Sequence, residues 1–341
     1  MKAHATPAEI EAVVERVQQA GFQAHKIVGV ERTVVACVGE ERGKEELAQL
    51  EFFSGVDSVL PVLKPYKLAA RELHPDGSRV DVGGVEIGGK RLAVMAGPCA
   101  IESAAQMQGA AQAVKAAGAH MLRGGAFKPR TSPYSFQGME HEGLLLLERA
   151  GREVGLPVVT EVMDPHDIER VAEHADMLQV GARNAQNFSL LRRLGKLNKP
   201  ILLKRGMSTK LDESLMAAEY ILSGGNTRVV LCERGIRTFE TATRNTFDAG
   251  AIVVLAEICP LPVIADPSHS AGRRSLVPGL ARAAVAAGAD GIIVEVHPHP
   301  EQAWSDGEQS LTPEEFDTMM ADLAPWCALR ASCRPLPEAV P

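Results

Sequence analysis

The chain has 341 residues, of which 45% are hydrophobic and 4% aromatic, and a formal net charge of −7 at pH 7. This length allows one large domain and a small one, and the negative charge argues against nucleic acid as a partner. No run approaches the roughly 18 apolar residues of a membrane span, residues 1–7 contain no export signal and the six cysteines form no CxxC pair, so we expect a soluble cytoplasmic chain with reduced thiols.

Residues 1–63 differ in character from the rest of the chain. Their pattern is a helix, two strands, a second helix and a strand, which are expected at 8–20, 26–30, 33–38, 44–53 and 56–62. This order is that of a ferredoxin-like split βαβ unit without its first strand, because Met1–Ala5 is a poor strand sequence. We therefore assign residues 1–70 to a small ferredoxin-like α+β domain.

Residues 71–91 are expected to connect this domain to the next one. Residues 80–91 alternate between apolar and polar types around Gly83 and Gly84, which predicts a hairpin. We expect the hairpin to close the N-terminal end of the large domain. At the other end of the chain, residues 328–341 contain three prolines and no periodicity, which predicts a loose tail.

Eight short apolar runs alternate with helical patterns between residues 92 and 327. The runs are Leu92–Gly97, Met121–Ala126, Val158–Val162, Met177–Ala182, Ile201–Arg205, Val229–Glu233, Val263–Asp266 and Gly291–Val296. Ala/Leu/Glu-rich segments between them predict helices at 103–117, 139–154, 211–222 and 273–287. Apolar runs separated by helices indicate parallel strands, and eight such units predict a (β/α)8 (TIM) barrel of the α/β class. A doubly wound sheet is the alternative, but the βα turns contain no G-x-G-x-x-G.

Positively charged side chains follow several of these strands, at the end where a (β/α)8 barrel builds its active site. After the second strand, residues 124–132 combine glycines, cations and hydroxyls in a way that suits a phosphate. The cations at the ends of strands two, four, five and six are Arg123, Lys128, Arg130, Arg183, Lys204 and Arg234. A single such residue is commonly a solvated surface charge, but burying all of them together is costly without anions. Two phosphates and a carboxylate would neutralise them, so we expect two anionic substrates.

Strands one, seven and eight, which become neighbours when the barrel closes, are followed by four candidate metal ligands. These are Cys99, His269, Glu295 and Asp306. Taken singly, Cys99 is interpreted as a small buried residue and His269 as a hydrogen-bonded loop residue. Taken together, one thiolate, one imidazole and two carboxylates favour Mn, Fe, Co or Zn over Mg. The sequence therefore predicts one divalent metal ion beside the anion site.

The role of Glu161, at the end of strand three, stays open at this stage. Its carboxylate either pairs with one of the cations or lies close enough to a bound water to accept its proton. Glu233, Arg237 and Arg244 are expected to form structural ion pairs.

Six motifs of the barrel region follow one another in a recognisable order. They are Gly97-Pro98-Cys99-Ala100-Ile101-Glu102-Ser103, Lys128-Pro129-Arg130-Thr131-Ser132, Gln179-Val180-Gly181-Ala182-Arg183-Asn184, Leu203-Lys204-Arg205-Gly206, Asp266-Pro267-Ser268-His269-Ser270 and Glu295-Val296-His297. Together they resemble the 3-deoxy-D-arabino-heptulosonate 7-phosphate (DAHP) synthase family, transferases at the first step of the shikimate pathway to the aromatic amino acids. The resemblance covers about 92–325, and residues 1–70 resemble the ferredoxin-like extension of the type I beta subgroup.

This resemblance implies condensation of phosphoenolpyruvate with erythrose 4-phosphate and water, with release of phosphate. It implies that the four candidate ligands bind the metal ion. The residues implied to hold phosphoenolpyruvate are Arg123, Lys128, Arg183, Lys204 and Arg234, with the backbone around Ala182. The phosphate of the aldose would bind Arg130 and Thr131. The implied catalytic residues are Lys128, which would protonate the aldehyde oxygen, Glu161, which would assist the attacking water, and the metal ligand His269.

Two alternatives remain open. The sister enzyme 3-deoxy-octulosonate 8-phosphate synthase, which takes arabinose 5-phosphate, shares the Gly-Pro-Cys start but typically carries Lys-Ala-Asn-Arg-Ser where this chain has residues 128–132. A non-catalytic amino-acid sensor would keep the barrel as a scaffold, although the complete ligand and cation sets argue against it. The resemblance also implies a homotetramer with a regulatory small domain that binds tyrosine or phenylalanine.

Overall fold

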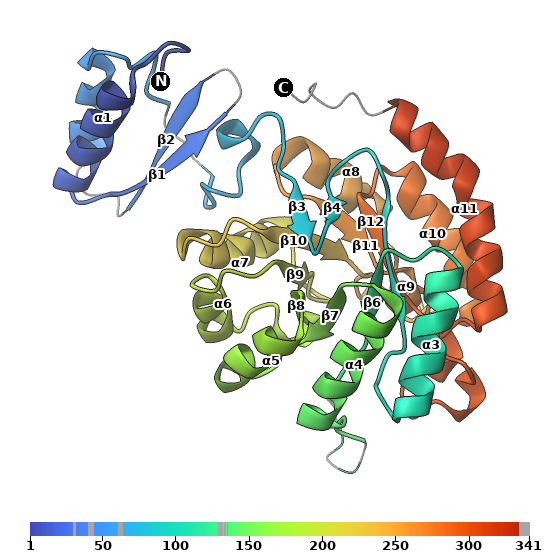
Figure 1. Cartoon of the computed structure of the whole chain (residues 1–341). Coiled ribbons are helices and arrows are strands. Elements are labelled where there is room, and N and C mark those ends of the chain that lie inside the picture. Colours follow the sequence, from blue (N-terminus) through green and yellow to red (C-terminus); the bar gives the residue numbers. More distant parts are fainter. Residues whose placement is uncertain are drawn as a thin grey trace.

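The computed structural model describes residues 1–29, 32–39, 44–60, 64–128, 132, 134 and 136–333. Figure 1 shows a large barrel surrounded by helices and a small N-terminal domain beside it. Within these ranges, no helix combines the length and the apolar character needed to cross a membrane.

The large domain is a closed barrel of eight parallel strands that follow one another in chain order. The strands are β5 Ala93–Gly97, β6 Met121–Arg123, β7 Val158–Glu161, β8 Met177–Val180, β9 Ile201–Lys204, β10 Val229–Glu233, β11 Val263–Ala265 and β12 Gly291–Glu295. Every residue of these strands is buried, because side chains fill the interior and helices cover the outside. The predicted (β/α)8 barrel is confirmed, and each strand lies within its expected run.

The helices pack around the strands in the order expected from the sequence. They are α3 Ala104–Ala116, α4 Glu140–Val154, α5 Ile168–His174, α6 Phe188–Leu194, α7 Leu211–Ser223, α8 Ala249–Ile258, α9 Pro267–Ala271, α10 Val277–Ala286 and α11 Pro313–Cys333. Local capping explains where several of them begin. The Ser103 hydroxyl accepts a hydrogen bond from the backbone N–H of Gln106 at 3.2 Å at the start of α3.

The last helix differs from its expected extent. We expected the barrel to end at residue 327 and a loose tail to follow, but α11 continues to Cys333. The reason is a side-chain contact beyond residue 327: the guanidinium of Arg330 pairs with buried Asp290 at 2.9 Å and donates to the backbone oxygen of Lys90 at 3.0 Å. Residues 334–341 lie outside the described ranges.

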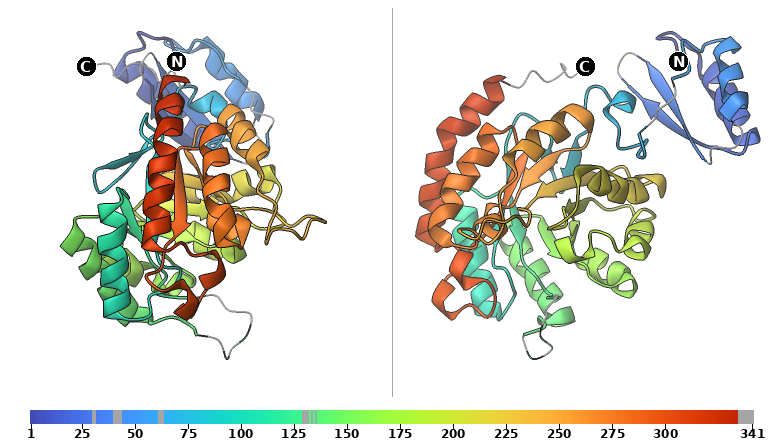
Figure 2. Two further views of the ribbon diagram at one scale, coloured as in Figure 1. Left: turned by 90° about the vertical axis from the view of Figure 1, so that its right-hand side faces the viewer. Right: turned by 180° about the vertical axis from the view of Figure 1, so that it is seen from behind.

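The hairpin before the barrel consists of β3 Val80–Val82 and β4 Val85–Ile87, which pair antiparallel. Val80 and Ile87 are fully buried in one cluster with inward-facing residues of the barrel strands. A Cβ at Gly83 would lie 2.9 Å from Pro157, which directly precedes β7. We infer from this packing that the hairpin closes the N-terminal end of the barrel. In the left view of Figure 2 it lies on the side opposite the projecting loop that follows β10.

The small domain contains α1 Pro7–Gln19, β1 Gln23–Val28, β2 Thr33–Val38 and α2 Lys44–Ala48, followed by a 3-10 turn at Gln49–Phe52. A capping box starts α1, since the Thr6 hydroxyl accepts from the Glu9 backbone and the Glu9 carboxylate accepts from the Thr6 backbone. β1 and β2 form an antiparallel pair. The helix and strand order expected for residues 8–53 is confirmed, with the first strand starting earlier than predicted.

The strand expected at 56–62 is not found among residues 56–60, which the structure describes without a strand. The remaining positions, 61 and 62, lie outside the described ranges. The apolar side chains of this segment pack all the same, because Val56 is buried in the small core and Val59 lies against it. The alternating apolar pattern therefore reflects the burial of these side chains. Burial of this kind does not require backbone hydrogen bonds to a neighbouring strand.

The segment that follows the small domain is attached to the barrel. The carboxylate of Glu219 in α7 accepts hydrogen bonds from the backbone N–H groups of Leu68 and Ala69, both at 2.9 Å. Buried Ala36 of β2 belongs to the same apolar cluster as Tyr66 and Leu68. The connecting segment therefore packs between the sheet of the small domain and α7.

Candidate active site

A cavity of about 410 Å³ opens at the C-terminal ends of the barrel strands. It is lined by Arg123, Lys128, Ser132, Glu161, Gln179, Gly181, Ala182, Arg183, Lys204, Met207, Arg234, Arg237, Arg244, Asn245, His269 and Asp306. A cavity of about 430 Å³ at the opposite end lies between the loops 195–198 and 224–228, which precede β9 and β10. The first one gathers charged side chains from several strands at the end where barrels of this kind carry out chemistry, so it is the candidate active site.

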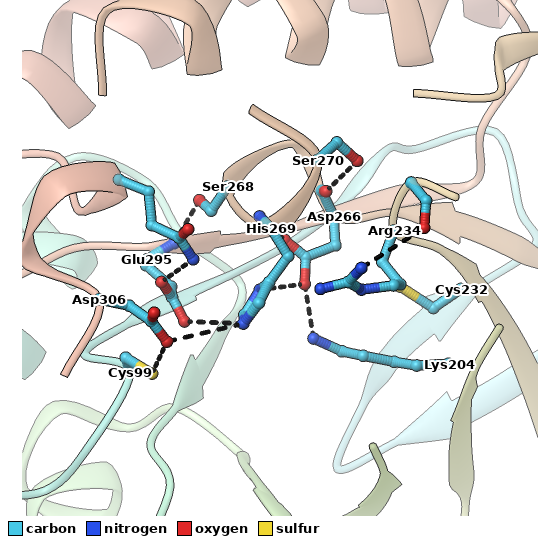
Figure 3. Close-up of polar contacts among 12 residues, drawn as sticks. Cys99, Lys204, Cys232, Arg234, Asp266, Ser268, His269, Ser270, Glu295 and Asp306 are labelled. Carbon is cyan, nitrogen blue, oxygen red and sulfur yellow. Dashed lines mark hydrogen bonds and ion pairs between the residues drawn. The ribbon is translucent and has the colours of Figure 1, made fainter. Parts of the chain in front are cut away.

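The four predicted metal ligands converge at the edge of this cavity. One ligand atom from each of Cys99, His269, Glu295 and Asp306 lies within 4.8 Å of the others. The Nε2 atom of His269 is 3.5 Å from Oε1 of Glu295 and 4.0 Å from Oδ2 of Asp306. Figure 3 shows the imidazole facing these two carboxylates, with Cys99 next to Asp306. Their predicted convergence is confirmed, although the residues span more than 200 positions of the sequence.

His269 is oriented by the residue that caps its own short helix. Asp266 accepts a hydrogen bond from the backbone N–H of His269 at 2.9 Å, and its Oδ2 lies 2.8 Å from the ring Nδ1. Lys204 approaches the same Oδ2 to 2.5 Å. Burial raises the pKa of Asp266, but the charges of His269 and Lys204 outweigh it, and the pKa falls well below its ordinary value. A charged Asp266 fixes Nδ1 and leaves Nε2 directed at the other three ligands.

Cys99 is a buried thiol among charges. Burial and the neighbouring Glu295 carboxylate raise the pKa of Cys99 to about 12. Its Sγ lies 3.1 Å from Oδ2 of Asp306 and 2.9 Å from Nζ of Lys128. A divalent cation would displace the thiol proton on binding, since thiolate is the ligand form. One sulfur, one nitrogen and two carboxylate oxygens fit a borderline divalent cation.

Asp306 has an unusual backbone. Its φ of 54° and ψ of 32° place it in the left-handed region, directly before the 3-10 turn Gly307–Gln309. Burial raises the pKa of Asp306, but His269 and Arg244 outweigh this effect and the pKa falls below its ordinary value. The charged carboxylate is thus the stable form at neutral pH.

Arg123 and Lys128 line the cavity and contact members of the ligand cluster. Arg123 donates to Oε1 of Glu295 at 3.1 Å and to the backbone oxygen of Pro98 at 2.9 Å. Its Nε is buried and has no hydrogen-bond partner within the described ranges. A buried donor without an acceptor is costly unless a ligand supplies one. Lys128 is 7% exposed and bonds the backbone oxygen of Cys99 at 3.0 Å, so both cations lie beside the ligand cluster.

The other predicted anion-binding residues lie around the same cavity where the structure describes them. Lys204 and Arg234 are buried, whereas Arg183 is exposed at the mouth. Burial lowers the pKa of Arg234. Arg130 and Thr131 lie outside the described ranges.

Glu161 is buried at the end of β7 and lines the cavity. Its Oε2 accepts a hydrogen bond from the side chain of Gln179 at 3.2 Å. Within the described part of the chain, no lysine, arginine or histidine nitrogen lies within 4.0 Å of it. The described residues therefore contain no contact that supports direct ion pairing of Glu161, one of the two interpretations drawn from the sequence.

Of the three residues expected in structural ion pairs, Arg244 and Glu233 form one within the described part of the chain and Arg237 does not. Arg237 is exposed at the cavity and forms no ion pair among the described residues, and Arg244 pairs with Oδ1 of the candidate ligand Asp306 at 2.8 Å. Glu233 does form the expected kind of pair, with Arg205 at 3.0 Å. The sequence also gave no signal for Gln309, a neutral residue whose Nε2 donates to Oε2 of Glu295 at 2.7 Å.

The fold and this site define a (β/α)8 barrel enzyme with a cavity rich in Lys and Arg side chains and a candidate metal centre. The model of the DAHP synthetase I family matches residues 72–326, and that of the DAHP synthase ferredoxin-like domain matches residues 1–64. The chain therefore belongs to the DAHP synthase family, in its form with an N-terminal ferredoxin-like domain.

Relatives support this assignment over the whole length. The phospho-2-dehydro-3-deoxyheptonate aldolase of Thermotoga maritima is 48% identical over 323 residues, which are 95% of each chain. A crystal structure of the T. maritima enzyme has a TM-score of 0.78 and covers 97% of this chain and 96% of its own. The 2-dehydro-3-deoxyphosphooctonate aldolase of Koribacter versatilis is 34% identical over 253 residues, 67% of this chain and 88% of its own. The octulosonate alternative therefore corresponds to more distant relatives that match a smaller part of the chain.

Proposed function

We propose that this protein condenses phosphoenolpyruvate with erythrose 4-phosphate and water to give 3-deoxy-D-arabino-heptulosonate 7-phosphate and phosphate. The family assignment supports this reaction. The observation that carries it is the position of four ligand-type side chains at the edge of a cavity lined by Arg123, Lys128, Arg183, Lys204 and Arg234. Such a site brings a metal ion and two anionic substrates into contact.

Cys99, His269, Glu295 and Asp306 would hold one divalent ion, with Mn, Fe, Co and Zn as the candidates. When bound there, the ion supplies Lewis-acid polarisation of the aldehyde oxygen. The protein's own part is to hold the four donors in fixed positions. Every one of these side chains is fixed by at least one further hydrogen bond or ion pair.

Arg123, Lys128, Arg183, Lys204 and Arg234 would neutralise the carboxylate and phosphate of phosphoenolpyruvate, with the backbone at Ala182 as a further contact. The free Nε of Arg123 supports this role, because a substrate oxygen would satisfy it. Arg130 and Thr131 would bind the phosphate of the aldose, a role that rests on the family resemblance.

Lys128 is proposed as the proton donor to the aldehyde oxygen. C3 of the enol attacks the aldehyde carbon, and the electron pair of the C=O bond goes to its oxygen, which takes a proton from Nζ. Water then adds to C2 with Glu161 accepting its proton, and the tetrahedral species loses phosphate by cleavage of the C–O bond. The position of Nζ, 2.9 Å from the candidate ligand Sγ of Cys99, supports the first transfer.

The experiment that tests the reaction measures phosphate release from phosphoenolpyruvate with erythrose 4-phosphate or arabinose 5-phosphate as the second substrate. We expect release with the four-carbon sugar. Release with arabinose 5-phosphate alone would establish the octulosonate alternative, and no release with either sugar in the presence of any divalent ion would support the sensor interpretation.

The role of Lys128 is tested by the variant Lys128→Ala. We expect turnover to fall far more than the affinity for phosphoenolpyruvate, because general acid catalysis contributes roughly 100- to 10,000-fold. Lys196→Ala, in the cavity at the opposite end of the barrel, is the matched control and should leave both quantities unchanged. A loss of affinity with unchanged turnover would remove Lys128 from the proton transfer.

We propose in addition a cytoplasmic homotetramer whose small domain binds tyrosine or phenylalanine. These features rest on the family resemblance. Initial rates with and without each amino acid, together with the mass of the assembly in solution, test them, and a rate that neither amino acid changes would contradict the regulatory role.

A further inference from the structure

The two carboxylate ligands are connected by a bridge that the reaction scheme does not use. Arg244 follows β10, and its Nη1 donates to Oδ1 of Asp306 and to Oε1 of Gln309, both at 2.8 Å. Gln309 in turn donates from Nε2 to Oε2 of Glu295 at 2.7 Å. One guanidinium and one amide thus join Asp306 to Glu295.

The chemistry of the partners fixes the orientation of the amide. A guanidinium only donates hydrogen bonds and a carboxylate only accepts them, so Gln309 must accept from Arg244 and donate to Glu295. The side chain of Gln309 is 2% exposed, which leaves little freedom for another arrangement. A shorter side chain would break at least one of the two contacts, and an apolar one would break both.

The bridge uses one oxygen of each carboxylate and leaves the other facing the centre. Oδ2 of Asp306 lies 3.1 Å from Sγ of Cys99. Oε1 of Glu295 lies 3.5 Å from Nε2 of His269 and also accepts a hydrogen bond from Arg123 at 3.1 Å. Oδ1 and Oε2 are directed at Arg244 and Gln309 respectively. The donor set is thereby limited to one sulfur, one nitrogen and two single oxygens.

Arg244 is held in place by its backbone as well as by its side chain. Its N–H donates to the backbone oxygen of Ala271 at 3.2 Å, and the next residue, Asn245, donates from Nδ2 to the backbone oxygen of His269 at 2.8 Å. Gly272 makes room for it, because a Cβ there would lie 2.3 Å from Cβ of Arg244. The loop after β10 is thus attached to α9, the helix that carries the imidazole ligand.

We infer that Arg244 and Gln309 are positioning residues that hold Glu295 and Asp306 as single-oxygen ligands and thereby set the affinity and coordination number of the metal centre. This inference rests on the proposed metal site, and it assigns to Arg244 and Gln309 the orientation of the two carboxylates. The bridge orients charges that would otherwise repel each other, since two carboxylates lie in one small volume. Loss of the bridge frees the second oxygen of each carboxylate to coordinate.

The test measures metal binding to the chelator-stripped protein in competition with a chromophoric chelator, using Zn²⁺ and Co²⁺. The variants are Gln309→Leu, Gln309→Glu, Arg244→Gln and the double variant Gln309→Leu/Arg244→Gln. Gln309→Glu keeps the size and the contact to Arg244 but removes the donor to Glu295, so it carries the test if Gln309→Leu does not fold. The matched controls are Gln108→Leu and Arg282→Gln, both on the outer helices.

We expect each single variant to bind metal roughly 10- to 100-fold more weakly than the unchanged protein. The double variant should bind no more weakly than the weaker single one, because the two residues act as one unit. The visible absorption of the Co²⁺ form should lose intensity in the variants, since freed carboxylates raise the coordination number.

The outcomes separate this inference from the proposed function. If the unchanged protein binds neither ion, the metal site itself is wrong. If it binds both ions and the Gln309 and Arg244 variants match it in affinity and Co²⁺ spectrum, the site stands and the bridge has no positioning role. Weakened binding in the controls to the same extent would also overturn the inference.

Discussion

The two ends of the barrel bury charge in different ways. At the N-terminal end, one ion pair joins Arg330 to Asp290, and Oδ2 of Asp290 also accepts from the backbone of Val263 at 2.8 Å. At the C-terminal end, seven Lys and Arg side chains but only two carboxylates, Glu161 and Asp306, line one cavity among the described residues. The cation is matched by a carboxylate at one end, whereas cations outnumber carboxylates at the other.

This difference predicts that buried charges at the N-terminal end contribute to stability and that those at the C-terminal end contribute to the reaction. A buried charge whose partner is removed is strongly destabilising, so a closed pair serves the fold. A cavity in which Lys and Arg side chains outnumber the carboxylates attracts anions, so it suits ligand binding. Substitutions at the two ends should therefore affect different measurements.

Removal of the metal ion is expected to have the largest effect. Treatment with a chelator should lower the rate of phosphate release by roughly 1,000-fold or more, because the carbonyl would lose its Lewis acid. Adding Mn²⁺, Co²⁺ or Zn²⁺ back should restore the rate. Turnover that persists in demonstrably metal-free protein would contradict the proposed metal role.

Breaking the closed pair at the other end should affect stability instead. Asp290→Asn removes the partner of buried Arg330, and we expect a loss of about 3–5 kcal/mol in the free energy of unfolding, measured by urea denaturation. The turnover number of the folded protein should stay unchanged. Asp322→Asn, in the exposed pair with Arg282, is the control and should change stability by less than about 1 kcal/mol.

Substitutions in the hairpin at the N-terminal end of the barrel should likewise lower stability and leave activity nearly unchanged. Ile87 is fully buried against the barrel interior, and Ile87→Ala should cost about 2–5 kcal/mol with little change in the Michaelis constants. Val85→Ala, at the less buried position of the same strand, provides the comparison. Equal losses of unfolding free energy in both variants would argue against a hairpin that closes this end of the barrel.

The smallest effect concerns pH. Burial and the charges of Arg91 and Lys115 lower the pKa of His120 from 6.5 to about 4, and its Nδ1 accepts from the backbone N–H of Val94 at 2.9 Å. Because the folded state disfavours the proton, this contribution to stability is complete above pH 6.5 and is lost as the pH falls toward 4.

His120→Asn keeps an acceptor for Val94 but does not titrate. Urea denaturation of both proteins between pH 7 and pH 4.5 should give a steeper loss for the unchanged protein. Parallel curves for the two proteins would show that His120 is not the group responsible.

The sequence could predict the barrel and the four ligand-type residues because both depend on strand ends. Parallel strands carry their C-terminal residues to the same edge, so Cys99 and His269 could be brought together without knowledge of the loops. Gln309 could not be found in this way, since it carries no charge and lies in a loop whose path depends on tertiary contacts.

The differences between the expected and the observed bounds of helices and strands have similar causes. The continuation of α11 to Cys333 depends on the contact between Arg330 and Asp290, which lie 40 positions apart. The strand expected at 56–62 was inferred from apolar alternation, which reports burial and leaves backbone pairing undetermined. Local patterns therefore identified elements well and their ends less well.

The left-handed backbone of Asp306 restricts which sequences can preserve this loop. Its conformation favours Asp, Asn and Gly, and a Cβ at the next position, Gly307, would lie 2.1 Å from the backbone oxygen of Pro300. A saturation library at these two positions should therefore yield few folded loops, and only those that keep the carboxylate would retain a ligand. The same pair of positions accordingly offers a compact signature for recognising intact sites among divergent sequences.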